Sequence, residues 1–296
     1  MPCDMKMCLI GIERQKCGNL WMHRVSVLGN QGLGTAVASL LANNTAILQG
    51  FDQQVRLYCP SELVYYDQKT DTIGNIINSQ HENIKYLSGF HIPENVVAVE
   101  DLNECFEGCD FLVIALPNLK INSMVPKIAG IVSDNCTAIC VSNGLGVTHN
   151  KAELLVDKVA SLLQKPCALF MGAQKLSPLI KKKPFDATFA TPDLSVFDAW
   201  KNLLVQEQMN VIPTTSVALF STTLFYIEAL AFGAGVIRGL DLSVYAVGIY
   251  IRKAIEEISS FTQFCFPDID ESCDVFLQTS LVGDLYAACT LNQFFR

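Results

Sequence analysis

The chain has 296 residues, of which 50% are apolar and 17% are charged, a composition that excludes a disordered protein and suits about two domains. It carries 21 basic and 29 acidic residues, a net charge of −8, and the scattered basic residues exclude a nucleic-acid partner bound through phosphates. The 12 cysteines form no paired CxxC units with partner histidines, which argues against a metal site and favours reduced, buried thiols.

Residues 1–22 precede the first apolar run and are predicted to be a short N-terminal extension. They include Asp4, Glu13 and Lys16, and they lack the apolar stretch of a signal peptide. The acidic residues also argue against a transit peptide. We therefore expect a cytoplasmic protein.

From residue 23 onward, short apolar runs alternate with segments of helical periodicity. The predicted strands are Val25–Leu28, Gln54–Cys59, Val96–Val99, Asp110–Leu116, Thr137–Val141 and Cys167–Met171. The predicted helices between them are Thr35–Leu41, Asp101–Glu107, Ile121–Ile131 and Glu153–Leu163. Strands that are apolar on both faces and separated by helices indicate a parallel sheet covered on both sides.

Helical periodicity takes over after Pro213, over Leu224–Phe232, Tyr245–Phe261 and Val275–Cys289. The pattern predicts an α/β fold, a Rossmann-type doubly wound parallel sheet followed by an all-α C-terminal domain. We expect a dinucleotide-binding-type domain over residues 23–212, with Val25–Leu28 as a central strand, and a helical domain over 213–296.

The stretch Val217–Ile237 holds a single charged residue, Glu228, and is long enough to cross a membrane. Its serine, threonine and glycine content and its lack of flanking Trp or Lys anchors favour a buried core helix. A membrane span is the alternative.

The first predicted strand runs into a glycine-rich loop, Gly29-Asn30-Gln31-Gly32-Leu33-Gly34, that opens the following helix. A strand, such a loop and a helix form the unit that binds a dinucleotide pyrophosphate at the helix N-terminus. Gln31 occupies the second-glycine position of G-x-G-x-x-G, where a side chain fills space that the pyrophosphate needs. A shifted loop that uses Gly32, or a turn that binds nothing, are the alternatives. Glu62 is the nearest candidate for the acid that binds the ribose.

Two longer strings follow: His81-Glu82-Asn83-Ile84-Lys85-Tyr86-Leu87 and Pro93-Glu94-Asn95-Val96-Val97-Ala98-Val99. They resemble the HENxKYL and PxNVVAV strings of eukaryotic-type NAD-dependent glycerol-3-phosphate dehydrogenase. Further matches follow in the family's order at Leu112–Pro117, Met171–Gln174, Phe232–Gly235, Gly239-Leu240, Arg252 and Gly283–Leu285. The resemblance runs from residue 23 to the end. It implies NAD as cofactor and the reversible reduction of dihydroxyacetone phosphate by NADH to glycerol 3-phosphate.

The resemblance also implies a catalytic lysine that polarises the substrate ketone and a second lysine that helps hold the site. Counted along the family motifs, these positions fall on Ile227 and Asn143. Neither residue can supply a positive charge. Lys120 and Lys175 are the candidates for a lysine that has moved into the site, and Lys175 is the better placed because its turn borders the nucleotide cleft.

Most other polar positions of the family's site are also substituted. Asp284 retains the family's aspartate, but the threonine after it falls on Ala288. The remaining family positions, an asparagine, an acid, a polar triplet and an arginine–asparagine phosphate grip, fall on or near Glu228, Ser221, Tyr245-Ala246-Val247, Asn292 and Arg296. The chain also stops before family members do, so the resemblance implies a shortened substrate-type domain over 213–296.

These substitutions favour a catalytically impaired or inactive relative that still binds a nucleotide or a partner. The alternatives are an active dehydrogenase with a relocated lysine and a truncated gene product of one. We expect weak or absent NAD binding, no nucleic-acid or membrane partner, and dihydroxyacetone phosphate or glycerol 3-phosphate as the substrate if activity remains. A shortened helical domain would expose apolar surface, which makes a homodimer possible.

Overall fold

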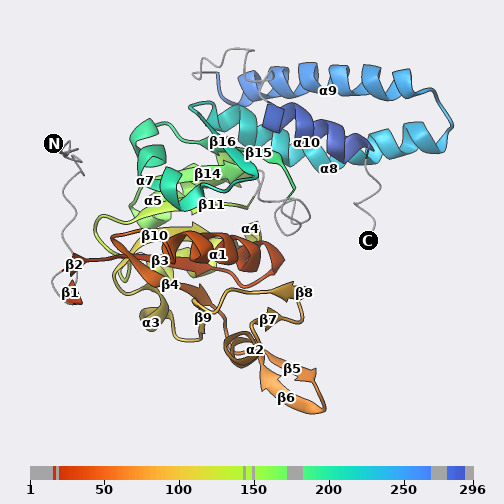
Figure 1. Ribbon diagram of the computed structural model, residues 1–296. Helices are drawn as coiled ribbons and strands as arrows, with labels where there is room; N and C mark the ends of the chain where they lie inside the picture. Colours follow the sequence, from red (N-terminus) through yellow and green to blue (C-terminus); the bar gives the residue numbers. More distant parts are fainter. Residues whose placement is uncertain are drawn as a thin grey trace, which may run out of the picture.

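The computed structural model describes residues 16–17, 20–142, 145–148, 151–171, 183–267 and 279–290. Within these residues, one eight-stranded sheet is covered by helices on both faces, and three long helices follow it in the chain (Figure 1). The predicted extension over 1–22 lies mostly outside the described residues. Its described part includes a two-stranded ribbon of β1 (Lys16–Cys17) and β2 (Leu20–Trp21).

The large sheet has the strand order β16-β15-β14-β11-β10-β3-β4-β9. Six neighbouring strands, from β14 to β9, are parallel, with β3 in the interior between β10 and β4. The strands are β3 (His23–Leu28), β4 (Phe51–Tyr58), β9 (Val96–Val99), β10 (Cys109–Ile114), β11 (Thr137–Cys140), β14 (Cys167–Met171), β15 (Phe185–Ala190) and β16 (Met209–Thr214).

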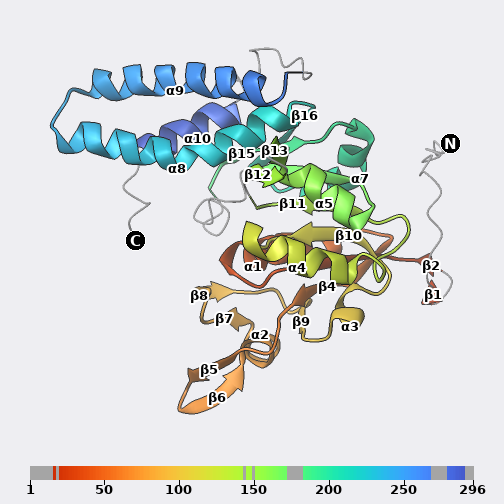
Figure 2. The ribbon, with the colours of Figure 1, turned by 180° about the vertical axis from the view of Figure 1, so that it is seen from behind.

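The helices cover the two faces of this sheet in separate groups. Figure 1 shows α1 and α7 on the near face, and Figure 2 shows α4 and α5 on the opposite face. The helices are α1 (Gly32–Thr45), α2 (Ile73–Gln80), α3 (Leu102–Phe106), α4 (Asn118–Ile128), α5 (Leu155–Leu163), α7 (Leu194–Leu204), α8 (Val217–Gly239), α9 (Val244–Cys265) and α10 (Thr279–Thr290). This arrangement confirms the predicted Rossmann-type fold with a helical C-terminal region.

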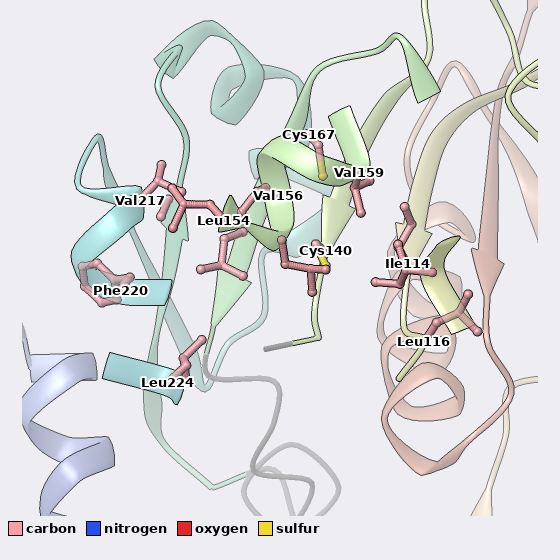
Figure 3. Packing of buried hydrophobic residues seen from close by; sticks show 14 of the residues in the cluster. Ile114, Leu116, Cys140, Leu154, Val156, Val159, Cys167, Val217, Phe220 and Leu224 are labelled. Carbon is pink, nitrogen blue, oxygen red and sulfur yellow. The ribbon is translucent and has the colours of Figure 1, made fainter. Parts of the chain in front are cut away.

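Alternating side chains divide the core into two clusters, one on each face of the sheet. In β10, Phe111 and Val113 pack with α1 and α7, whereas Leu112 and Ile114 pack with α4 and α5. Figure 3 shows the second cluster running from Ile114 through α5 to α8. The strand is buried along its whole length because both of its faces are covered.

The sheet differs from the predicted all-parallel arrangement at one edge. β15 pairs antiparallel with β14, and β16 runs parallel to β15. Neither strand was predicted, because their sequences, FDATFA and MNVIPT, mix polar residues, alanine and proline with few large apolar side chains. The predicted helix over Glu153–Leu163 begins later, at Leu155, since β13 (Lys151–Leu154) pairs with β12 (Leu145–Thr148).

The predicted core helix Val217–Ile237 lies within α8, which is bent by 42° between Val217–Ile227 and Ala229–Gly239. Among the described residues, no single helix has the length and apolar character of a membrane span. The two halves of α8 together meet the criteria of length and composition. The side chains of Phe220 and Leu224 are buried in the cluster shown in Figure 3, and Ile227 belongs to the same cluster.

Candidate functional site

A pocket of about 450 Å³ lies at the carboxyl ends of β3, β4 and β10. The chain passes from β3 outward through β4 to β9 and then returns to β10 on the other side of β3. Doubly wound sheets bind ligands at such a reversal of strand order, outside the carboxyl ends of the strands. The lining residues are Gly29, Asn30, Gln31, Tyr58, Pro60, Glu62, Tyr86, Ala115, Leu116, Pro117, Lys120, Ser123 and Met124.

The glycine-rich loop forms one wall of this pocket. Gly29 has a φ of +125°, and a Cβ atom there would lie 2.4 Å from the carbonyl oxygen of Ala115. A Cβ atom on Gly34 would lie 1.9 Å from the carbonyl oxygen of Gly29. Both positions therefore require glycine. Gln31 is exposed at the N-cap of α1, and its side chain lines the pocket without capping the helix.

Asn83, in the HENIKYL string, fixes the shape of the loop. Its Nδ2 donates hydrogen bonds to the carbonyl oxygen of Asn30 and to Oγ1 of Thr35, both at 2.8 Å. Its Oδ1 accepts one from the backbone N–H of Tyr86 at 3.1 Å. Asn83 is fully buried, so these bonds lie away from water. The sequence identifies this string only by resemblance, and the structure shows that it joins the loop to a neighbouring hairpin.

That hairpin consists of β7 (Glu82–Asn83) and β8 (Leu87–His91), and its turn holds Glu62 at the pocket. Lys85 forms an ion pair with Glu62, and the hydroxyl of Tyr86 lies 3.1 Å from Oε2 of Glu62. The hydrogen bond from Lys85 is the main reason that the pKa of Glu62 lies below its usual value. A second hairpin, β5 (Leu63–Tyr66) and β6 (Lys69–Thr72), follows Glu62 directly.

The opposite wall of the pocket is formed by the chain that leaves β10. Pro117 is the N-cap of α4, and Lys120 follows in the first turn of this helix. Neither α1 nor α4 has a side-chain cap or an acidic residue in its first turn, so both helix N-termini carry free N–H groups. Asn30 is 8% exposed, and its Nδ2 has no hydrogen-bond partner. The pocket therefore offers donors and positive potential, which suit an anionic ligand.

The thiol of Cys59 also lies near Asn30, but it does not act as an anion at neutral pH. Burial raises the pKa of this thiol to about 12, and no hydrogen bond of normal geometry joins it to Asn30. Cys59 is one of eight cysteines found free, seven of which are buried; the others are Cys105, Cys109, Cys136, Cys140, Cys167, Cys289 and the half-buried Cys265. Within the described part of the chain, no three His, Cys, Asp or Glu side chains form a group that could hold a metal ion.

The positions predicted to carry the chemistry are largely apolar. Ile227 is 8% exposed and Ala288 is 6% exposed, and both belong to the cluster that packs α8 and α10 together. Ser221 is buried in α8, and its Oγ has no hydrogen-bond partner. Tyr245, at the start of the substituted triplet, is 79% exposed.

Several predicted site residues fall outside the described part of the chain. Asn143, Lys175, Asn292 and Arg296 lie there. Asp284 and Glu228 belong to described helices, but their side chains are not among the described ones. The structure thus brings together the loop residues, Glu62 and Lys120 at one pocket, and it leaves the role of Asp284 as a prediction.

The fold and pocket together define a Rossmann-type protein of the dinucleotide-binding class. The family model for the N-terminus of NAD-dependent glycerol-3-phosphate dehydrogenases matches residues 24–196. The chain therefore belongs to the NAD-dependent glycerol-3-phosphate dehydrogenase family.

Individual relatives agree with this assignment. The cytoplasmic NAD⁺ glycerol-3-phosphate dehydrogenase of Homo sapiens is 27% identical over 267 residues, 90% of this chain and 75% of the relative. A glycerol-3-phosphate dehydrogenase 1-like protein of Danio rerio is 26% identical over 266 residues, with the same shares of the two chains. The solved glycerol-3-phosphate dehydrogenase of Saccharomyces cerevisiae superimposes with a TM-score of 0.81 at 25% identity, over 90% of this chain and 77% of that one.

Proposed function

We propose that this chain is a catalytically impaired member of its family that retains the nucleotide pocket. The family reaction converts dihydroxyacetone phosphate and NADH to glycerol 3-phosphate and NAD. The observation that carries the proposal is Ile227, an apolar and buried side chain at the position where the resemblance implies the catalytic lysine. Its neighbours in the cluster include Leu224 and Leu230, which cannot stabilise charge either.

The chemical argument concerns the oxygen of the substrate ketone. Hydride addition turns this oxygen into an alkoxide, which needs a positioned cation or hydrogen-bond donor. Loss of one such donor typically lowers the rate by about 10²–10³. Asn143 and Ala288 remove a second cation and a hydroxyl from the same network, but such losses are not additive. We therefore expect a total deficit of about 10³–10⁵ relative to family members.

A second candidate function is an active dehydrogenase with a relocated lysine. The observation that favours it is Lys120, which lines the pocket and whose ammonium forms no ion pair with any described residue. A truncated product of a dehydrogenase gene is the remaining alternative. A longer transcript that restores the substituted residues would support it.

Steady-state oxidation of NADH by dihydroxyacetone phosphate tests the proposal. We expect the wild type to be as slow as Asp284→Ala, since Asp284 is the retained member of an otherwise substituted network. A robust wild-type rate that Asp284→Ala abolishes would instead establish an ordinary dehydrogenase with rearranged lysines.

We also infer that NAD binds weakly, because Gln31 lines the pocket at the position of closest approach to the pyrophosphate. We also propose the division into a nucleotide-binding domain over 23–212 and a helical domain over 213–296; all residues that line the pocket fall within the first of these. The names of several relatives support a cytoplasmic location.

We further propose that the chain forms a homodimer through its helical region. Large apolar side chains on α8, α9 and α10 are exposed, and exposed apolar surface of this kind, where it is contiguous, is typical of interfaces. They include Phe225, Phe232, Val236, Tyr245, Ile249, Phe264 and Tyr286. Analytical ultracentrifugation of the wild type and Phe232→Glu tests this proposal: a wild-type dimer that the charge dissociates supports it, and a wild-type monomer refutes it.

A further inference from the structure

The pocket is more positive than its lining alone suggests, because two helices from opposite faces of the sheet begin at it. α1 packs in the cluster on one face and α4 packs in the cluster on the other, and Figures 1 and 2 show them on opposite sides. Each helix presents free N–H groups and the positive end of its dipole at its first turn. The negative charge of Glu62, on the rim, is compensated by Lys85.

Lys120 adds a full positive charge at a place where the fold disfavours one. A cation in the first turn of a helix opposes the helix dipole, at a cost of a few tenths to about 1 kcal/mol. Lys120 is exposed and forms no direct ion pair among the described residues. Its charge acts on Glu62 through space, but that carboxylate is already paired with Lys85. A ligand that carries negative charge into the pocket would account for its presence.

Asn30 lies on the other wall of the pocket, is more than nine-tenths buried, and has an Nδ2 that forms no hydrogen bond. This nitrogen is itself buried and lies beside the thiol of Cys59, so a ligand reaches it only if the side chain turns toward the pocket. An acceptor that then pairs with it removes the cost of an unsatisfied buried donor. Phosphate oxygens are acceptors of this kind, and a diphosphate brings more of them, and more negative charge, into the pocket than a single phosphate.

We propose that Lys120 binds the diphosphate of an ADP-type nucleotide, from the wall opposite the glycine loop, and that it sets which nucleotides the pocket accepts. The contact compensates for Gln31, which restricts the approach of the phosphates to the loop itself. The ligand is either free ADP or the ADP half of NADH, since both present the same diphosphate. This inference rests on the proposed retention of a nucleotide pocket.

The test is calorimetric titration of the full chain with ADP, NADH and adenosine at low salt. The variants are Lys120→Ala, Lys120→Arg and Lys127→Ala, the last being an exposed lysine in the last turn of the same helix. We expect Lys120→Ala to weaken the binding of phosphate-bearing ligands by about tenfold or more, the usual effect of losing a charge-assisted hydrogen bond. Lys120→Arg and Lys127→Ala should bind like the wild type, and adenosine should not distinguish any of them.

The two proposals fail in different ways. If the wild type binds ADP or NADH and Lys120→Ala binds them equally well, the role of Lys120 is refuted while the nucleotide pocket stands. If the wild type binds neither nucleotide, both proposals are refuted. Binding of NADH without ADP, lost in Lys120→Ala, supports the inference and identifies the dinucleotide as the source of the diphosphate. Melting temperatures show whether each variant is folded. Lys120→Ala removes a positive charge that opposes the dipole of α4, so this variant should melt no lower than the wild type.

Discussion

Replacing Asn83 should destabilise the protein more than its position in a surface hairpin suggests. Asn83→Ala removes the hydrogen bonds to Asn30, Thr35 and Tyr86 from a fully buried site. Each hydrogen bond contributes about 1 kcal/mol net to stability, and a buried polar group left without a hydrogen-bond partner costs about 1–3 kcal/mol. The carbonyl oxygen of Asn30 keeps one bond, from Oγ1 of Thr35 at 3.0 Å, whereas the N–H of Tyr86 loses its partner. We therefore expect a loss of about 2–4 kcal/mol in the free energy of unfolding.

Asn83→Asp is the sharper variant because it keeps the shape and the Oδ1 acceptor but replaces the donor with a charged oxygen. That oxygen would face the carbonyl oxygen of Asn30, so at pH 7 the loss should at least equal that of Asn83→Ala. Urea unfolding followed by circular dichroism measures both variants. Asn75→Ala is the control, since it removes one hydrogen bond, to Asp71, from an exposed site and should cost less than about 0.5 kcal/mol. A loss below about 1 kcal/mol in both Asn83 variants would refute the assigned role of this residue.

Three further predictions concern the pocket and the substituted site. Gln31→Gly should tighten NADH binding, because it removes a side chain at the position of closest approach to the pyrophosphate. The free energy of unfolding should not change, because glycine is also an acceptable N-cap. Equal affinities of variant and wild type in calorimetry would mean that a shifted loop already uses Gly32. Ile227→Lys should lower the melting temperature by burying an ammonium group in an apolar cluster, and should not restore turnover; a gain in NADH oxidation would contradict this. Glu62→Gln should destabilise the protein by less than about 1 kcal/mol at pH 7, since the pair with Lys85 is partly exposed. The pKa of Glu62 is lowered in the folded state, so the stabilisation by its ion pair is fully present above the unfolded pKa of about 4.3. This stabilisation is lost as the pH falls through the lower pKa of the folded state. A stability difference between Glu62→Gln and the wild type that persists in urea titrations at pH 2–3 would contradict the role given to the ion pair.

The sequence predicts the part of the fold that local patterns determine. Strands such as Asp110–Leu116 are continuous apolar runs, and β10 (Cys109–Ile114) lies where this pattern places it. The glycines at positions 29 and 34 follow from the turn that they make. β15 and β16 are not predictable from the sequence, because pairing with neighbouring strands stabilises them more than the strand propensity of their own residues does.

The sequence cannot predict the contacts that join distant segments. Asn83 and Asn30 are 53 residues apart, and only the folded chain brings them together. The same applies to Lys120, which nothing in the sequence ties to the glycine loop but which lines the same pocket as Gln31 in the folded chain. The substitution at Ile227 was visible from the sequence, but its burial within the helical cluster is a finding of the structure.

The central claim, a pocket that binds nucleotide without turning over substrate, is tested most directly by NADH fluorescence in one experiment. Excess protein is added to NADH until its fluorescence changes and saturates, and dihydroxyacetone phosphate is then added to saturation. The account predicts a change on protein addition and then only a slow loss of fluorescence, about 10³–10⁵-fold slower than with an active family member, because NADH is bound but scarcely oxidised. A rapid loss of NADH fluorescence after the substrate is added, or no change on protein addition at all, would contradict it.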